Sequence, residues 1–169
     1  LWENIIPSKY EAQVRHPVEV VDGRVPVVVG CMAYRPQAVS TMIARAARWG
    51  ASAAMVTPSF YGGLSATDAV AALSPVVERS ELPVMVYNNP HSTGVDLLPE
   101  DLVPLLEHEA MWSVKETSGA ATRVRELRAH LGTEVEVLVG ADGLALEGFT
   151  QGASGWVAAS AWLAPARCV

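Results

Sequence analysis

The sequence is poor in positive charge and in the residue patterns that bind metals or form disulfides. Of 169 residues, 12 are Lys or Arg and 18 are Asp or Glu, which gives a formal net charge of -6. The basic residues are scattered, so we expect no nucleic-acid partner and no attraction to an anionic membrane surface. Cys31 and Cys168 lack CxxC or Cys/His spacing. They indicate neither a zinc site nor a disulfide framework and favour a cytoplasmic location.

Long apolar runs and phosphate-binding glycine motifs are also missing. No run approaches the roughly 20 apolar residues that a membrane-spanning helix needs, so we expect no membrane contact. No GxGxxG or GxxxxGK[ST] motif follows a strand pattern, which weakens a nucleotide-binding interpretation. Half of the residues are hydrophobic and no linker is visible, so we predict a single domain over residues 1–169.

Short apolar segments alternate with helical patterns along the chain. We expect strands at 25–30, 53–57, 83–87, 111–115, 135–140 and 155–158, and helices at 8–22, 36–49, 66–79, 122–131 and 144–149, with a further helix opening at Pro99. Strands that are apolar on both faces are typical of parallel sheets covered by helices. The strand ends recur about every 25 to 30 residues, which fits the βα units of a barrel. A doubly wound open sheet has the same spacing and stays an alternative.

Lysine is rare, because the chain holds only Lys9 and Lys115. Lys9 lies in a polar, helical stretch where an ammonium is simply solvated. Lys115 closes the apolar run that starts at Met111, and there burial disfavours the charged ammonium and makes a free amine available. Such an amine is suited to forming a Schiff base with a carbonyl substrate. The alternative is a strand-end lysine that reaches solvent or pairs with Glu116.

Tyr87 ends the strand that comes before the Lys115 strand in the sequence. Chemistry in a barrel lies at the carboxyl ends of the strands, so the two side chains can face one mouth. The amine would add to a 2-oxo acid, and the phenol would relay protons as the carbinolamine dehydrates to the imine. A lone strand-end tyrosine is more often a packing residue, and its lysine neighbour is what favours the catalytic interpretation.

Two segments carry a resemblance to a known family. The run Tyr87–Gly94 (YNNPHSTG) and the run Met111–Thr117 (MWSVKET) resemble the signature of the dihydrodipicolinate synthase/N-acetylneuraminate lyase family. Further matches, around Gly30, Gly50 and Gly140, extend the resemblance over nearly the whole chain. The family consists of (β/α)8 TIM barrels of the class I aldolase type. The resemblance implies this α/β fold, here with only about six βα units present.

The resemblance also implies residue roles. Lys115 would be the Schiff-base lysine and Tyr87 the proton-relay tyrosine. Gly140 and Val157 would line the pocket for the keto-acid end of a pyruvate-like substrate. No metal or organic cofactor is expected, because the protonated imine on the lysine withdraws the electrons itself.

Other expected site positions depart in part from the residues that the family carries there. Thr57, at a strand end, and Ser92, in the loop after Tyr87, are the remaining expected substrate-binding residues. Ser92 stands where dihydrodipicolinate synthases carry an arginine that grips a second carboxylate, and a hydroxyl cannot supply that bidentate ion pair. Phe60 stands where those enzymes place a second relay tyrosine, with Tyr61 beside it. These departures argue against lysine biosynthesis. The Trp156-containing end and the Tyr-Asn-Asn-Pro form more closely resemble lyase, aldolase or deaminase members that act on other 2-oxo acids. Asp142 is expected to be a helix N-cap rather than a catalytic acid.

Part of the family pattern is absent. The family opens with two strands and a Gly-Thr-Thr-Gly-Glu turn that holds the substrate carboxylate; here Glu3 matches that glutamate, while Leu1 and Trp2 replace the threonine and the glycine. Six βα units cannot close an eight-stranded barrel. We therefore expect a fragment or an incompletely recorded chain, a partner that supplies the missing strands, or a degenerate homologue.

Together these observations predict a Schiff-base-forming lyase or aldolase that acts on pyruvate or a related 2-oxo acid, forming or cleaving a carbon–carbon or carbon–oxygen bond. We expect a homo-oligomer, either a dimer or a tetramer. The alternative is a catalytically inactive homologue that serves as a binding or regulatory protein.

Overall fold

A single sheet of six strands forms the centre of the molecule. The structure is a computed structural model, and it describes residues 7–168. The strands are β1 (Val28–Gly30), β2 (Ala53–Val56), β3 (Val84–Asn88), β4 (Met111–Glu116), β5 (Glu136–Val139) and β6 (Gly155–Trp156). They are all parallel and lie side by side in sequence order. A doubly wound sheet reverses its strand order at a switch point, so the barrel prediction is confirmed and the open-sheet alternative is wrong.

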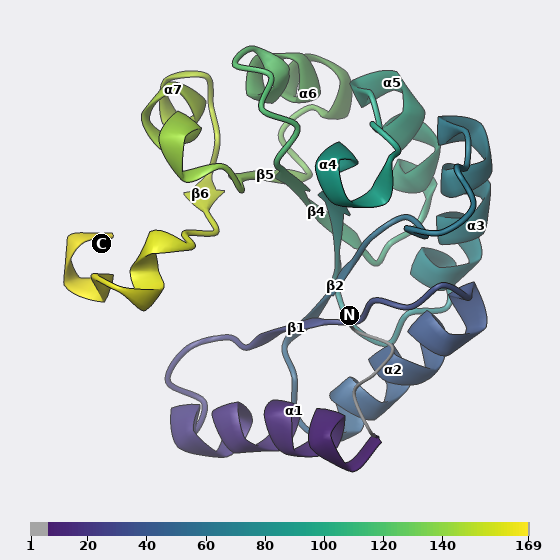
Figure 1. Cartoon of the computed structure of the whole chain (residues 1–169), viewed down its shortest axis with the longest axis vertical. Coiled ribbons are helices and arrows are strands. Elements are labelled where there is room, and N and C mark those ends of the chain that lie inside the picture. The colour runs from purple at the N-terminus through teal and green to yellow at the C-terminus, as the bar shows by residue number, and fades with distance from the viewer. Residues whose placement is uncertain (1–6, 169) are drawn as a thin grey trace.

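Helices connect the strands and cover one face of the sheet. They are α1 (Pro7–Val21), α2 (Pro36–Arg48), α3 (Ala66–Glu78), α4 (Pro90–Thr93), α5 (Pro99–Leu102), α6 (Arg123–Leu131) and α7 (Ala145–Thr150), with the 3-10 turns η2 (Val103–Glu107), η3 (Asp142–Leu144), η4 (Ser160–Trp162) and η5 (Pro165–Arg167). Figure 1 shows the helices as an arc outside the strands, open between α1 and the C-terminal turns. None of the helices described is both long and apolar enough to cross a bilayer.

The expected elements are found, with ends that shift by up to three residues. The largest shift is at β1, which begins at Val28 rather than Val25. Pro26 has no N–H to donate to a strand ladder, which explains the late start. The helix that opens at Pro99 is a single α-turn continued by η2. Pro104 has no N–H, so it cannot donate the backbone hydrogen bond that would extend the α-helix. The one-turn helix α4 was not expected.

Alternation along the strands decides which side chains meet the helices. On β3, Val84 and Val86 are fully buried in the core that the helices cover. Met85 and Tyr87 point to the opposite, inner face, because successive side chains of a strand alternate. The largest fully buried side chains are Ile43, Leu97, Leu102, Leu105, Leu127, Val56, Val76, Val77, Val84, Val86, Val114 and Val137.

The two outer strands each leave one edge without a strand partner in the part of the chain that the structure describes. These are β1 and β6. Apolar side chains near them remain exposed: Val28 is 40% exposed, and Trp162 and Leu163 are 92% and 91% exposed. Unpaired strand edges beside apolar side chains favour association with another chain.

We therefore expect the 169-residue polypeptide to associate in solution. Sedimentation velocity should show species larger than a monomer, and the double variant Val28→Lys/Trp162→Arg should shift the distribution toward the monomer. The matched control is Leu98→Lys, since Leu98 has the same 40% exposure but lies before α5, away from both edges. A monodisperse wild-type monomer that unfolds cooperatively would contradict the prediction.

Candidate active site

Tyr87 and Lys115 are brought together by the pairing of two strands. They are direct partners in the parallel register of β3 with β4. Partners in a parallel pair point to the same face, here the inner one. The Lys115 Nζ atom lies 4.0 Å from the centroid of the Tyr87 ring, within cation–π range. The two residues predicted to be catalytic are therefore in contact.

A cleft of about 480 Å³ opens around this pair. It is lined by Met32, Met55, Thr57, Phe60, Tyr87, Asn89, Ser92, Thr93 and Lys115. Among these lining residues Lys115 is the one charged group, and the rest are apolar side chains, hydroxyls and one amide. A mainly apolar cleft with a few convergent polar groups and one amine suits a small anionic carbonyl compound. Within residues 7–168, no three His, Cys, Asp or Glu side chains gather as metal ligands.

The four expected substrate-binding residues occupy different places. Thr57, buried just after β2, and Ser92, exposed in α4, both line the cleft. Gly140 and Val157 are not among its lining residues. The Val157 amide donates to the carbonyl oxygen of Val139 at 2.8 Å, which extends the pairing of β6 with β5 by one residue.

Gly140 lies behind the Lys115 side chain, where space excludes any larger residue. Its amide donates to the carbonyl oxygen of Glu116 at 2.7 Å, which holds the two backbones close together. A Cβ atom at this position would overlap the Thr117 hydroxyl and lie 2.8 Å from Lys115 Cε. Gly140 therefore leaves the room that the lysine stem occupies.

The Tyr87 phenol is held by the loop that follows β3. Asn89 is the N-cap of α4, and Pro90 begins that helix, where its fixed φ and missing N–H are tolerated. Asn89 Nδ2 donates to Tyr87 Oη at 2.8 Å and to Ser92 Oγ at 3.0 Å. The turn ends at Gly94, whose φ of 73° is in the left-handed region. This short turn places an amide directly against the phenol.

A buried polar network lies on the other face of β3 and β4. Asn88 and Glu116 are register partners, and Asn88 Nδ2 donates to Glu116 Oε2 and to Asp96 Oδ1, each at 2.9 Å. Arg123 pairs with both oxygens of Asp96, each N···O distance being 2.8 Å. Its Nη1 atom also lies 3.9 Å from Glu116 Oε2. The Ser118 amide donates to Glu116 as well.

This network decides one alternative that the sequence left open. The Glu116 carboxylate faces Asn88 and Arg123 on the helix-covered side, whereas Lys115 faces the cleft. The interpretation in which Lys115 pairs with Glu116 is therefore wrong. The Arg123 guanidinium holds the pKa of Asp96 below its usual value, chiefly through their hydrogen bonds and against the effect of burial. The same hydrogen bonds raise the pKa of Arg123.

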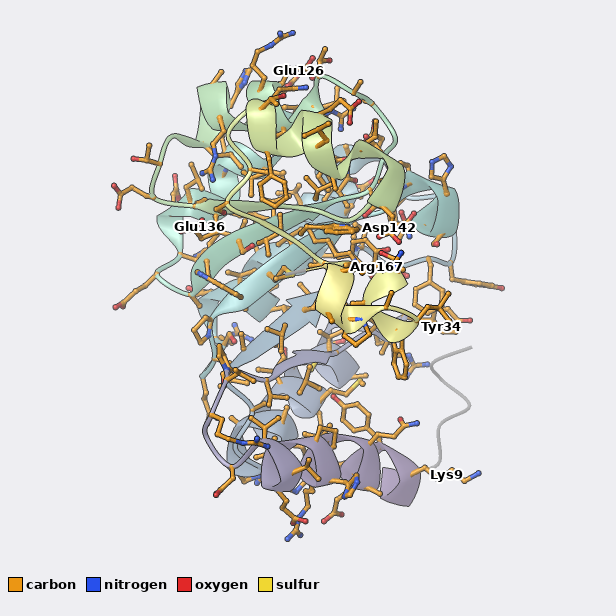
Figure 2. The ribbon with its side chains drawn as sticks, turned by 90° about the vertical axis from the view of Figure 1, so that its left-hand side faces the viewer. Lys9, Tyr34, Glu126, Glu136, Asp142 and Arg167 are labelled. Carbon is orange, nitrogen blue, oxygen red and sulfur yellow. The ribbon has the colours of Figure 1, made fainter. Side chains whose placement is uncertain are left out.

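Asp142 anchors the C-terminal turns. Its carboxylate accepts hydrogen bonds from Trp156 Nε1 at 3.0 Å and from the amides of Ala159 and Ser160 at 3.0 and 2.8 Å. Desolvation would raise the pKa of Asp142, but these hydrogen bonds outweigh it and the pKa lies below its usual value. The N-cap of η3 is Ala141, so the expected capping role is wrong. Figure 2 shows Asp142 beside the C-terminal turns, where it makes structural contacts.

Phe60 and Tyr61 are neighbours in the sequence but line different cavities. Phe60 lines the cleft, whereas Tyr61 lines a neighbouring cavity of about 300 Å³. Leu1, Trp2 and Glu3, which were compared with the carboxylate-binding turn of the family, lie outside the described residues.

Several residues of the site were not predicted from the sequence. Asn89 and Thr93 line the cleft from the run that follows a strand end, and that position alone could have indicated them. Met32 and Met55 carry no comparable signal, because apolar residues near strands are usually core. Asn88 and Glu116 are polar residues at the ends of apolar strands. That pattern was the available sign of the buried network.

The strand order, the outer helices and the lysine in a cleft at the carboxyl ends of the strands define an open portion of a (β/α)8 barrel. The model of the Dihydrodipicolinate synthetase family matches residues 6–169. The chain belongs to this family, and the resemblance noted in its sequence is confirmed.

The chain matches individual relatives over about half of their length. The 4-hydroxy-tetrahydrodipicolinate synthase of Rhizorhabdus wittichii is 32% identical over 155 residues, which are 92% of this chain and 53% of the relative. The enzyme of the same name from an Exiguobacterium species is 31% identical over 153 residues, 90% of this chain and 52% of the relative. The chain therefore spans about half the length of the curated relatives it matches.

Solved structures of the family also match the chain over little more than half of their length. The chloride-inhibited dihydrodipicolinate synthase of Acinetobacter baumannii in complex with pyruvate has a TM-score of 0.93 at 25% identity, covering 98% of this chain and 57% of that one. The prophage protein YagE from E. coli K12, also in complex with pyruvate, has a TM-score of 0.90 at 26% identity, covering 99% and 58%. The six strands correspond to part of the barrel of these molecules.

The steric role of Gly140 can be tested by adding one methyl group. Gly140→Ala should lower the free energy of unfolding by about 1–3 kcal/mol, because the new Cβ collides with Thr117 and the Lys115 stem. Gly143→Ala is the matched control, since a Cβ there meets nothing within 4 Å. Urea unfolding of both variants measures the difference. Equal stability of the two variants would contradict the steric argument.

The ion pair of Asp96 predicts a pH dependence of stability. The folded-state pKa of Asp96 is depressed, so its contribution is present above the unfolded value of about 3.9 and is lost as the pH falls through the folded value. Thermal melts between about pH 2 and 6 should show a smaller acid-induced loss of stability in Asp96→Asn than in the wild type. Asp22→Asn, at an exposed turn with φ 49°, is the control and should keep the wild-type profile. A wild-type profile for Asp96→Asn would argue against the pair.

Proposed function

We propose that this chain carries the imine-forming centre of a lyase or aldolase that acts on pyruvate or a related 2-oxo acid. The observation that carries the proposal is the contact of Lys115 Nζ with the Tyr87 ring, 4.0 Å from its centroid, inside a cleft with no other charged lining residue. Membership of the family supports it, as do the two structurally similar family proteins that were solved with pyruvate.

The proposed chemistry begins with the free amine of Lys115. Its lone pair attacks the C2 carbonyl carbon of the 2-oxo acid. The nitrogen then gives up one proton and the carbonyl oxygen takes one up, which gives a carbinolamine. Tyr87 then donates a proton to the departing hydroxyl, which leaves as water while the nitrogen forms the C=N bond. The protonated imine draws electrons from the bonds of the neighbouring carbon, C3. In the direction of synthesis C3 loses a proton and bonds to a second substrate, and in the direction of cleavage that bond breaks and C3 regains a proton. In this scheme no metal or organic cofactor is needed.

The hydroxyls of the cleft suit the acid end of the substrate. Thr57 and Ser92 both line the cleft and can donate hydrogen bonds to a carboxylate. In the proposal Gly140 leaves room for the lysine stem, and Val157 borders the substrate from the end of β6. Ser92 carries no charge, so a second carboxylate would find no bidentate partner there. We therefore propose a partner substrate other than that of lysine biosynthesis.

The proposed oligomeric state and cellular location rest on the strand edges and on the two cysteines. The free edges of β1 and β6 call for another chain, which favours a homo-oligomer, a dimer or a tetramer. Cys31 and Cys168 are both free thiols, which favours the reducing cytoplasm.

Borohydride reduction in the presence of pyruvate tests the proposal directly. Intact-mass and peptide mass spectrometry should show one adduct, confined to Lys115 and absent from Lys115→Ala. Lys9→Ala is the matched control and should keep the adduct, because Lys9 is the other lysine of the chain and lies on the exposed surface of α1. Tyr87→Phe should slow adduct formation by roughly 10²- to 10⁴-fold, the usual contribution of a positioned proton donor.

The absence of any adduct on folded wild-type protein would contradict the proposed activity. The chain would then be better described as a binding or regulatory homologue that keeps the fold without the reaction. An adduct that survives in Lys115→Ala would also overturn the assignment of the amine.

A further inference from the structure

One polar side chain of the cleft touches the phenol and has no role in the scheme above. Asn89 lines the cleft, and its Nδ2 atom lies 2.8 Å from Tyr87 Oη and 3.0 Å from Ser92 Oγ. An Asn side-chain nitrogen carries two hydrogens, and these two contacts use both of them. Each contact is with a hydroxyl, a group that can either donate or accept. The orientation of the amide therefore decides which way the phenol points its own hydrogen.

The backbone around Asn89 fixes this amide in place. As the N-cap of α4 it has φ -142° and ψ 80°. Its carbonyl oxygen accepts hydrogen bonds from the amides of Ser92 and Thr93 and from Thr93 Oγ1, all at 3.0 Å. The Thr93 side chain is buried and also accepts from the Val95 amide. These bonds hold the backbone of Asn89, and the two contacts of its Nδ2 atom with Tyr87 Oη and Ser92 Oγ hold the side chain.

We infer that Asn89 is a positioning residue that directs the proton of Tyr87 into the cleft. The amide donates to the phenol oxygen, so the phenol keeps its own hydrogen for the bound substrate. When Tyr87 gives that proton to the departing hydroxyl of the carbinolamine, the negative charge left on Oη faces an N–H donor. The inference deepens the proposed function and rests on it.

The same amide prepares a second donor at the rim of the cleft. Ser92 Oγ accepts from Asn89, so the Ser92 hydrogen is free to point toward a bound molecule. Tyr87 and Ser92 then both present O–H donors to the cleft that the Lys115 amine also lines. This arrangement fits a substrate that offers oxygen acceptors, such as a carboxylate or a hydroxyl, next to its reacting carbonyl.

Two substitutions at Asn89 separate this role from a structural one. Asn89→Asp keeps the size and shape of the side chain, but a carboxylate only accepts, so it would take the Tyr87 hydrogen away from the cleft. Asn89→Ala removes the donor and leaves the phenol to water. A purely structural role predicts that Asp performs better than Ala, because Asp keeps the volume of the side chain and can still bond to the Tyr87 and Ser92 hydroxyls. The donor role predicts the reverse order.

The measurement is the initial rate of imine formation with pyruvate, trapped by cyanoborohydride and followed by intact mass. We expect Asn89→Asp to be roughly 10- to 100-fold slower than the wild type and slower than Asn89→Ala. Gln13→Glu, the same amide-to-carboxylate change on the exposed side of α1, should keep the wild-type rate. A melting curve on each variant verifies that the proteins compared are folded.

A double-mutant cycle with Tyr87→Phe completes the test. Because the inferred effect acts through the phenol, Asn89→Asp should change the residual rate of Tyr87→Phe by less than about twofold. A wild-type rate in Asn89→Asp, a slower rate in Asn89→Ala than in Asn89→Asp, or an undiminished effect in the Tyr87→Phe background would overturn the inference. These results leave the proposed function standing. A wild-type protein that forms no imine would instead overturn the proposed function, and this inference with it.

Discussion

The register between β3 and β4 is the constraint on which the rest of the site depends. It sets Tyr87 opposite Lys115 on the inner face and Asn88 opposite Glu116 on the outer face. A slip of one residue would exchange the two faces, placing the amine among the helices and the carboxylate in the cleft. The hydrogen bond between Asn88 and Glu116 therefore favours the register that places Tyr87 beside Lys115, although it lies on the other side of the sheet.

The outer network specifies the arrangement more than it stabilises it. Arg123 is 7% exposed in its side chain and Glu116 5%, so both charges lose most of their hydration on folding. Ion pairs in such places gain little net stability, because the desolvation cost offsets much of the attraction. What they do is penalise any arrangement that leaves one charge alone. Asp96, between β3 and α5, and Arg123, at the start of α6, thereby tie two helical connections to the strands that carry the site.

The parts of this site that the sequence predicted and the parts that it did not differ in their physical origin. The strands and helices follow from local apolar patterns, and Lys115 and Tyr87 stand out because a polar residue closes an apolar strand. The outer network requires the exact register of two strands that are distant in sequence, and local patterns do not carry that information. Gly140 was expected from the family resemblance to line the pocket. Its observed role is to make space for the lysine, a constraint visible only when the two backbones are placed together.

The position of the pair within the sheet also matters. β3 and β4 are the two central strands of the six, so their contacts are complete on both sides, whereas the open edges lie two strands away. The strand neighbours of Tyr87 and Lys115 are therefore present on both sides in the described structure. The carboxylate of a bound 2-oxo acid, in contrast, needs a counter-charge inside the cleft. Among the residues that line the described cleft, only Lys115 can meet this charge, as ammonium or as protonated imine, and hydroxyls such as Thr57 and Ser92 supply neutral donors. A single cation balances a single carboxylate, and a second carboxylate would have to be desolvated without a counter-charge. Under the proposed function, this charge balance suits a mono-carboxylate carbonyl compound and a partner whose reacting end is uncharged.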